Sequence, residues 1–367
     1  MCVDLRFVNS GTINDKYPTP IGDELLMRIS SANVITTLDN SSGYWQIPLR
    51  EEDCYKTAFI SHRGLYEFLI LPYGLKTASN TFTRVMNDIL APHHDFADAF
   101  IDDSAVFSKN WDLHMSHLDA VLQSFTDVGM TLKLSKCKFA RDSVQFLGHI
   151  IGSGLRRPIF DRVEAIRQMP EPTTKKLLRS FLGTCNFYKN YVKNYSAISF
   201  PLTELTKDKF SNNISFNDTE CKAFNDLKNA LCNFTLLHSA KYDRDFILRT
   251  DASAYAIGAC LSQLDDQGVE YPVAFVSAKL NETQRRRPII ENEAFALLYA
   301  LQKLDVYIYL SKIRVFMDHN PLHYIINSLP TSPRLCRWAL ALQRYDLDIQ
   351  YIKGSENIIS DCLSRVV

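Results

Sequence analysis

The sequence predicts a multidomain α/β protein, and its length, its composition and its order of strand and helix patterns lead to that prediction. A single hydrophobic core usually stops growing at about 250–300 residues, so 367 residues suit two or three packed units. Apolar residues make up 46% of the chain and charged residues 22%, as in globular proteins. No apolar run approaches the roughly 18 residues of a membrane span, and the N-terminus lacks a secretory signal pattern. We therefore expect an intracellular, cytoplasmic protein without membrane contact.

The first half of the chain predicts alternating strands and helices with acidic turns. Residues 34–39 (VITTLD) predict a β-strand that ends on Asp39, and residues 78–91 show apolar positions at helical spacing. Two apolar segments flank Asp102-Asp103-Ser104, which predicts a hairpin with carboxylates at its tip. Further elements are expected in this order: a helix at 113–129, a hairpin at 143–155, and basic helices from Asp161 to about Tyr195, interrupted by Pro170 and Pro172.

The C-terminal third predicts a separate α/β domain. A polar segment with turn-forming residues at 205–216 marks a boundary. Beyond it the apolar patterns follow the order β-β-β-α-β-α-β-α. The expected segments are strands within 246–263, 270–280 and 313–320, a helix at 291–304, and closing segments at 347–354 and 357–365.

The charges are unevenly distributed, although the formal net charge is zero. Residues 131–193 carry thirteen Lys and Arg against four acids, whereas residues 1–130 carry seventeen acids against nine bases. Solvated faces would explain any single cluster, but metal ions and phosphate groups explain the two clusters together. The nine cysteines form no C-x-x-C pair, so we interpret them as reduced packing thiols rather than zinc ligands.

Asp39, Asp102 and Asp103 form a first set of candidate catalytic carboxylates. Each terminates or interrupts an apolar strand, where unpaired like charges are expensive to hold. Two Mg²⁺ ions about 3.5–4 Å apart would meet that need, one activating an attacking 3′-oxygen and the other clamping a leaving pyrophosphate. Surface turns are also rich in Asp, so the doublet alone does not separate a site from a turn.

Four blocks in this half of the chain carry further information. They are LDNSSGYWQIPL at 38–49, LPYGLKTASNTF at 71–82, FIDD at 100–103 and LKLSKCKFARDSVQFLGHII at 132–151. In order and spacing these blocks resemble the polymerase motifs of gypsy-type (Metaviridae-like) long-terminal-repeat retrotransposons. The resemblance implies an α+β palm with fingers and a helical thumb, in which Asp39, Asp102 and Asp103 are the metal-binding catalytic carboxylates.

The same resemblance implies three nucleotide-binding residues. The Asn40 carbonyl would add a metal ligand, and Phe82 with the helix that it starts would lie against the template and the incoming nucleotide. Tyr44 would lie under the nucleotide sugar, where its ring would collide with a 2′-hydroxyl and so select deoxynucleotides. The alternative for Tyr44 is a packing aromatic with a satisfied hydroxyl. FLGH at 146–149 resembles the primer grip, and the basic residues beyond it would follow duplex phosphates without reading sequence.

A second series of acids follows in the C-terminal domain: Asp251 in RTDAS, Glu293 in ENEAFALL, Asp318 in FMDHNPL and Asp361 in IISDCLSR. Their order on strand, helix, strand and closing helix resembles an RNase H-like α/β domain. The resemblance implies a second two-metal centre that activates water to cut RNA in an RNA–DNA hybrid, with 2′-hydroxyls identifying the RNA strand. Glu291 is a rival for Glu293, but ENEAFALLYAL matches the family helix with Glu293.

The resemblance covers nearly the whole chain and implies an RNA-directed DNA polymerase with a linked ribonuclease H. We expect N-terminally truncated fingers with the palm at 1–151, thumb and connection at 152–240, and the RNase H-like domain at 241–367. The expected partners are an RNA template, a DNA primer, the RNA–DNA hybrid and deoxynucleoside triphosphates. Each active site would hold two Mg²⁺, with Mn²⁺ as the alternative ion. Protease and integrase would be other parts of the same polyprotein, and a virus-like particle or the nucleus are alternative locations.

The sequence departs from the family pattern without losing a carboxylate. Phe100 replaces the usual Tyr before the Asp doublet, Ser79 stands where Pro is common, and RRRPIIE replaces the usual approach to the helix at 291–304. Because the chain opens at MCVDLR, inside the fingers, we expect weak polymerisation and retained hybrid cleavage. The alternative is a truncated or domesticated element that binds nucleic acid with an inactive polymerase half. A non-retroviral element is disfavoured, because KCKF, FLGH and an attached RNase H occur together in the gypsy-type arrangement.

Overall fold

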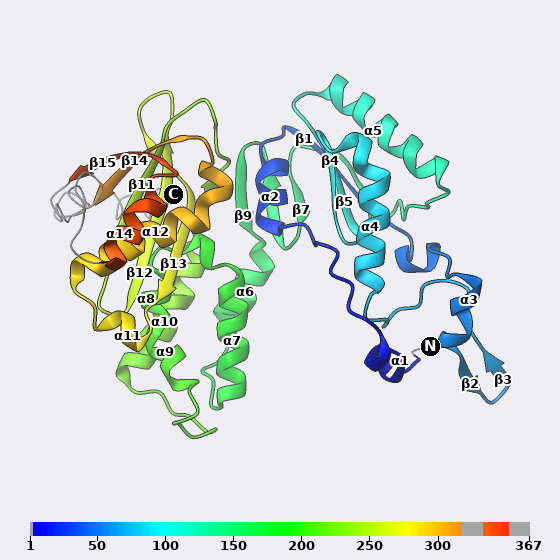
Figure 1. The fold of residues 1–367 in the computed structure, drawn as a ribbon, viewed down its shortest axis with the longest axis horizontal. Helices are drawn as coiled ribbons and strands as arrows, with labels where there is room; N and C mark the ends of the chain where they lie inside the picture. Colours follow the sequence, from blue (N-terminus) through cyan, green and yellow to red (C-terminus); the bar gives the residue numbers. More distant parts are fainter. Residues whose placement is uncertain (1–2, 318–332, 352–367) are drawn as a thin grey trace. The chain divides into compact units, whose positions relative to one another are not determined.

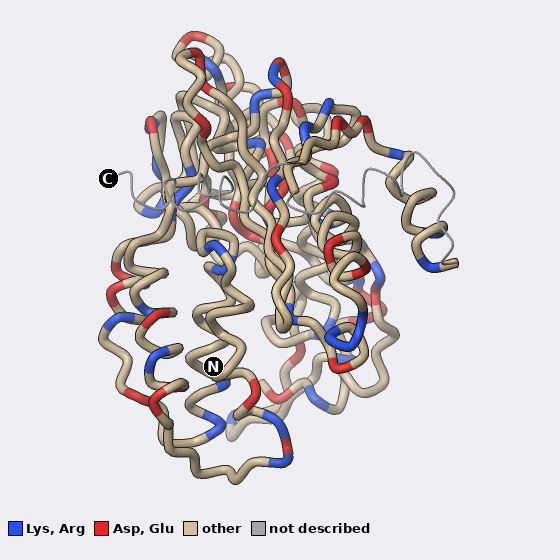
Figure 2. The backbone as a smooth tube through the Cα atoms, turned by 90° about the vertical axis from the view of Figure 1, so that its left-hand side faces the viewer, with Lys and Arg blue, Asp and Glu red and all other residues tan. Residues whose placement is uncertain are grey.

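The computed structural model describes residues 3–317 and 333–351. The chain divides into two compact units, unit 1 (Met1–Gly154) and unit 2 (Leu155–Val367), which are labelled by element in Figure 1. Figure 2 shows the positions of Lys and Arg and of Asp and Glu along the backbone. The two kinds of charge are interspersed, and the formal net charge is zero. Of the described helices, none is long and apolar enough to cross a membrane.

Unit 1 is built from short helices and short strands. Its elements are α1 Arg6–Gly11, α2 Gly22–Ser30, β1 Val34–Asp39, η1 Gly43–Gln46, α3 Glu51–Cys54, η2 Tyr55–Thr57, β2 Phe59–Ser61, β3 Gly64–Tyr66, α4 Ala78–Leu90, η3 Ala91–His93, β4 Ala97–Phe100, β5 Asp103–Ser108, α5 Trp111–Asp127, β6 Lys138–Arg141, β7 Val144–Phe146 and β8 His149–Gly152.

An antiparallel sheet with the strand order β4-β5-β1-β6 forms the centre of unit 1. Alternate residues of a strand point to opposite faces, and both faces of this sheet are buried. One face packs against α4 and α5 through Leu38, Phe82, Met86, Val106, Val121 and Phe125. The other packs against α2 and the β7–β8 hairpin through Leu26, Ile29, Ile35, Ala105, Phe107, Val144, Phe146 and Ile151.

The structure confirms the elements that the sequence predicted in unit 1. The strand at 34–39, the helices Ala78–Leu90 and Trp111–Asp127, and the β7–β8 hairpin all form. The side chain of Asn110 caps α5 by accepting a hydrogen bond from the backbone N–H of Leu113. α2 and the small β2–β3 hairpin were not predicted, and the three-residue strands of the hairpin are too short for a periodic signal.

In the described part of unit 2, a mainly helical segment precedes a five-stranded sheet. Its elements are β9 Leu155–Pro158, α6 Phe160–Gln168, α7 Lys175–Phe187, η4 Lys189–Tyr191, α8 Tyr195–Ile198, α9 Phe200–Leu205, α10 Asp218–Cys232, β10 Leu237–His238, β11 Phe246–Ala252, β12 Ala256–Leu264, β13 Glu270–Lys279, α11 Glu282–Arg285, α12 Ile289–Ile308, β14 Lys312–Met317, α14 Pro333–Leu342 and β15 Asp346–Tyr351.

The sheet of unit 2 has the order β13-β12-β11-β14-β15, with β13, β12 and β11 antiparallel and with β14 and β15 parallel to β11. Ile257 of β12 packs against Ala296 of α12, so α12 covers one face. Cys260 and Phe275 join the apolar cluster of α7, α8 and α10, which covers the opposite face. The sheet therefore lies between two helical layers, as in an α/β domain.

The helical segment at the start of unit 2 confirms the prediction of basic helices broken by proline. α6 ends at Gln168 and α7 begins at Lys175, so Pro170 and Pro172 lie between them. The side chain of Thr174 caps α7, and Asn217 with Glu220 forms a capping box on α10. Residues 155–240 share one compact unit with the five-stranded sheet, and the boundary at 240/241 stays a prediction.

Candidate active sites

The carboxylates of the first set meet where β1 ends and the β4–β5 hairpin turns. Asp39 is the last residue of β1 and Asp103 the first of β5, and the two are register partners. Asp102 lies in the turn, directly after Ile101, whose φ of 57° is uncommon for a β-branched residue. The structure thus confirms the predicted hairpin with carboxylates at its tip and places Asp39 beside it.

The three carboxylates share one electrostatic environment. Burial raises the pKa of Asp103, and the negative charges of Asp102 and Asp39 raise it further, whereas Lys136 lowers it. The Lys136 ammonium lies 3.2 Å from Oδ2 of Asp39. Among the described residues, no three His, Cys, Asp or Glu side chains stand close enough to hold a metal ion by themselves. The site therefore consists of two acids facing each other, a third in the adjoining turn, and one lysine counter-ion.

A cleft of about 620 Å³ opens beside this site within unit 1. Asp39 and Asp103 line it together with Lys136, with Lys138 and Arg141 of β6, and with residues of β7. Acids on one side and cations on the other suit a ligand that carries phosphate groups and bound cations.

The Tyr44 ring packs against two other aromatic rings next to the carboxylates. Its ring meets Tyr73 at 5.2 Å and Phe82 at 5.3 Å between centroids, both edge to face. Burial raises the pKa of Tyr44, and the charge of Asp102 raises it further, which places the phenol in the field of the site. A Cβ on Gly43 would lie 2.7 Å from the Phe82 ring, so only glycine permits this close packing.

The Phe82 side chain is fully buried under the turn that carries Tyr44. The expectation that Phe82 and its helix lie against the template and the incoming nucleotide stays a prediction. In the structure, the position of Phe82 in α4 supports the Tyr44 ring. Whether a helix residue is buried or exposed depends on which face of the helix is turned toward the core. The motif match did not indicate that face for Phe82.

Asn40 is buried at the end of β1. Its Nδ2 donates to Sδ of Met86 at 3.6 Å, and the described structure offers its Oδ1 no hydrogen-bond partner. The side chain thus belongs to the core, which leaves the backbone carbonyl as the atom to which the metal-ligand prediction applies. That role stays a prediction.

Two further residues of this site, Lys136 and Gln46, carry no signal in the sequence motifs that marks them as site residues. Gln46 donates to the backbone carbonyls of Ser41 and Thr131 at 2.7 and 3.0 Å and accepts from the N–H of Thr131 at 2.7 Å, which holds the Tyr44 turn in place. Lys136 lies in the KCKF block, where the alternation of basic residues indicates charge without identifying a site residue.

The structure describes two acids of the second set. Asp251 lies near the end of β11, and Glu293 is buried in α12, which packs against β11. The rival Glu291 forms an ion pair with Arg334 at 2.6 Å, which favours Glu293 as the family carboxylate. The predicted ligands Asp318 and Asp361 lie outside the described residues.

Comparisons with known proteins agree with this architecture. Residues 1–151 match the family model described as reverse transcriptase (RNA-dependent DNA polymerase), and residues 241–345 match the RNase H-like domain found in reverse transcriptase. The fold is similar to that of a foamy viral protease-reverse transcriptase in complex with double-stranded DNA. The TM-score is 0.84 at 22% identity, over 96% of this chain and 75% of that one.

Curated relatives match the chain from end to end. The retrovirus-related Pol polyprotein from transposon opus of Drosophila melanogaster is 37% identical over 100% of this chain and 38% of its own length. The Pol polyprotein from transposon gypsy of the same species is 34% identical, with 36% of its length covered. The Tf2-3 polyprotein of Schizosaccharomyces pombe is 32% identical, with 28% covered. The chain thus spans well under half of these relatives. It belongs to the family of Pol polyproteins of gypsy-type long-terminal-repeat transposons, as a segment with reverse transcriptase and RNase H-like domains.

Proposed function

We propose that this chain acts as an RNA-directed DNA polymerase with a linked ribonuclease H that degrades the RNA strand of RNA–DNA hybrids. The observation that carries the proposal is the pairing of Asp39 with Asp103, with Asp102 in the adjoining turn. Solved relatives of the same fold are complexes with double-stranded DNA and with an RNA/DNA hybrid. RNA template, DNA primer and deoxynucleoside triphosphates are accordingly the proposed ligands of unit 1.

The carboxylates of unit 1 fit a divalent cation. The pKa of Asp103 is raised by burial and then by Asp102 and Asp39, so a cation among these acids would relieve a repulsion that the structure already contains. Mg²⁺ usually takes one or two protein carboxylates together with substrate phosphates, so a preformed three-ligand cluster is not required. We propose Asp39, Asp102 and Asp103 as holders of two Mg²⁺. When bound, such ions activate the attacking oxygen and stabilise charge on the leaving group.

The other residues of unit 1 bind and orient the substrates. Lys136 neutralises Asp39 before substrate arrives, and Lys138 and Arg141 offer the cleft further positive charge for backbone phosphates. The Tyr44 ring packs against Phe82 and forms a fixed surface beside Asp102 on which a nucleotide sugar could lie. A sugar without a 2′-hydroxyl would fit against the Tyr44 ring, whereas the 2′-hydroxyl of a ribose would collide with it.

Unit 2 would supply the nuclease activity. We propose that Asp251 and Glu293, with Asp318 and Asp361, hold the cations that activate the attacking water. Glu293 is 2% exposed, so α12 fixes its carboxylate more firmly than a surface residue would be fixed. The two reactions use separate carboxylate sets in separate units.

Separate carboxylates make the two activities separable by mutation. We expect Asp102→Asn to lower primer extension at least about 10²-fold and to spare cleavage of an RNA–DNA hybrid. Asp251→Asn should do the reverse. Both assays are run on one preparation, with Asp112→Asn, an exposed acid of α5, as the matched control. Loss of both activities in either folded variant would contradict the assignment, and a parent chain without any hybrid cleavage would contradict the nuclease function.

A further inference from the structure

One row of residues crosses the RNase H-like sheet from Asp251. Asp251 in β11 is the register partner of Gly258 in β12, and Gly258 is the partner of Ser277 in β13. Directly opposed residues of neighbouring strands lie on the same face of a sheet. The position of Asp251 is therefore tied through strand pairing to two neighbours on its own face.

Asn194 and Ser196, from the helical part of unit 2, contact both of these neighbours. A Cβ on Gly258 would lie 2.2 Å from Oδ1 of Asn194, so the Asn194 amide packs directly on the Gly258 backbone. The backbone N–H and the hydroxyl of Ser196 reach Oγ of Ser277 at 3.1 and 3.0 Å. Asn194 has φ 53°, a left-handed conformation that Asn tolerates better than most residues. The chain thus bends at Asn194 to bring α8 onto this face.

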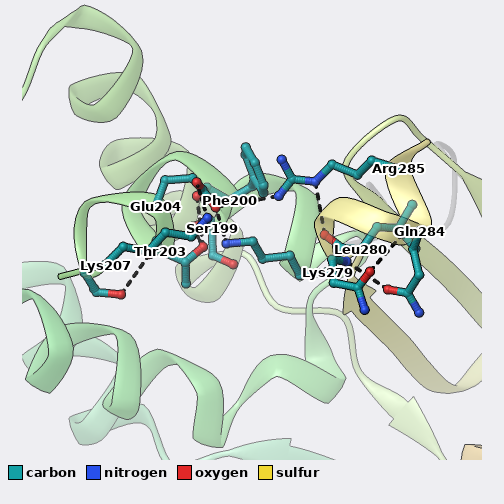
Figure 3. A network of polar contacts seen from close by, with 11 residues as sticks. Ser199, Phe200, Thr203, Glu204, Lys207, Lys279, Leu280, Gln284 and Arg285 are labelled. Carbon is teal, nitrogen blue, oxygen red and sulfur yellow. Dashed lines mark hydrogen bonds and ion pairs between the residues drawn. The ribbon is translucent and has the colours of Figure 1, made fainter. Parts of the chain in front are cut away.

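α9 adds a charged contact at the end of the same strands (Figure 3). Oε1 of Glu204 lies 2.5 Å from Nζ of Lys279 in β13, and Oε2 lies 2.8 Å from Nζ of Lys207. Arg285 of α11 approaches Oε1 at 3.6 Å. Partial burial works against ionisation, but the hydrogen bonds from Lys207 and Lys279 lower the pKa of Glu204 to about 2. Glu204 is therefore ionised at neutral pH.

Phe200 extends this contact to the turn that follows Asp251. Its ring lies 4.8 Å from the ring of Tyr255, which is in the turn between β11 and β12, and 4.6 Å from the Arg285 guanidinium. The backbone carbonyl of Tyr255 also accepts a hydrogen bond from the N–H of Leu280 at 2.8 Å. Residues 194–205, here called the buttress, thus contact the sheet beside Asp251 and at the turn after it.

We propose that the buttress positions Asp251 for hybrid cleavage, with Asn194 and Ser196 as the positioning residues. This inference rests on the proposed nuclease function of unit 2. Neither residue needs to touch substrate, because Asn194 contacts Gly258, the register partner of Asp251, and Ser196 contacts Ser277, the register partner of Gly258. Displacing a reacting group by about 1 Å can cost on the order of 10² in rate, and partners that orient metal ligands are worth about 10–100-fold. The buttress would make the helical segment part of the nuclease machinery.

Single substitutions test the contacts one at a time. Ser196→Ala and Asn194→Gly should each lower kcat for hybrid cleavage on the order of 10-fold and leave KM for the hybrid unchanged. The Mg²⁺ concentration at half-maximal cleavage should rise, because Asp251 is held less precisely. Amide exchange in the peptide that carries Asp251 should become faster, while primer extension by the same preparation stays at the parent level. Asn233→Gly, the same exchange at an exposed helix end, is the matched control and should change none of these values.

A second-site rescue tests the direct contact between Asn194 and Gly258. Gly258→Ala should nearly abolish cleavage, because its methyl group would overlap Oδ1 of Asn194. Combining it with Asn194→Gly removes that oxygen and should restore cleavage to the level of Asn194→Gly alone. Should Gly258→Ala fail to fold, the kcat and the Mg²⁺ dependence of Ser196→Ala still test whether the buttress positions Asp251.

Three results would overturn the inference. A double variant as defective as Gly258→Ala would show that Asn194 is not the obstacle. Parent-like kcat and Mg²⁺ dependence in both Ser196→Ala and Asn194→Gly would show that the buttress does not position Asp251, while the nuclease function would stand. A parent chain that cleaves no hybrid would overturn the proposed function and this inference together.

Discussion

Glu270→Gln should destabilise the RNase H-like sheet strongly, because the carboxylate of Glu270 is the centre of a buried polar group. Nε and Nη2 of Arg249 donate to its two oxygens at 3.0 and 2.8 Å, and Oγ of Ser262 donates at 2.5 Å. The side chains of Arg249 and Glu270 are 9% and 8% exposed. The substitution would leave a buried guanidinium without a counter-charge.

The size of this effect follows from the burial. Breaking a buried ion pair by removing one partner costs about 3–5 kcal/mol, which is a large fraction of the 5–15 kcal/mol that stabilises a typical domain. Each 1.4 kcal/mol is a factor of about ten in an opening equilibrium, so amides of β11–β13 should exchange about 10²–10⁴-fold faster. Hybrid cleavage should fall as well, since Arg249 lies two residues before Asp251 in β11.

Hydrogen exchange of peptides from β11–β13 measures this directly, and a paired substitution provides the control. Arg249→Met combined with Glu270→Leu removes both charges, and apolar replacements of a buried pair are often neutral or stabilising. We expect the double variant to recover most of the protection that Glu270→Gln loses. Exchange in Glu270→Gln within about threefold of the parent, or a double variant worse than the single one, would refute the reasoning.

Two further predictions concern unit 1. Tyr44→Ala should lower the ratio of deoxynucleotide to ribonucleotide incorporation efficiency in primer extension, and a ratio equal to the parent's would make Tyr44 a packing aromatic only. Burial, and then the nearby His117, lowers the pKa of His114 below 6.5. At acidic pH, His114 therefore binds a proton in the unfolded chain more readily than in the folded chain. Unit 1 should therefore lose stability as pH falls below about 6.5, by up to about 1.4 kcal/mol per pH unit; a urea midpoint that stays constant or rises between pH 7.5 and 5.5 would contradict this.

Much of the fold could be predicted from the sequence because local patterns specify its longer elements. The helix Trp111–Asp127 carries apolar residues at helical spacing, and the strand Val34–Asp39 is rich in β-branched residues. The pairing of Asp39 with Asp103 could not be predicted from periodicity, because register depends on contacts between strands far apart in sequence. The motif resemblance supplied that proximity instead. It could not indicate that Phe82 faces the core, because a match of residue types contains no information on the burial of a side chain.

The residues that the motifs did not reveal share one property: each holds or neutralises a candidate site residue, and none would react with substrate itself. Lys136 was visible as a charge but not as the counter-ion of Asp39, which depends on the pairing of β6 with β1. Asn194 and Gly258 are far apart in sequence, and neither residue type suggests chemistry. Their contact exists only because a left-handed turn meets a strand position without a side chain. Carboxylates that bind metal are recognisable from residue type and spacing, whereas the residues that hold them in place are recognisable only from packing. The buttress is therefore a conclusion that the folded chain supports and its motifs do not.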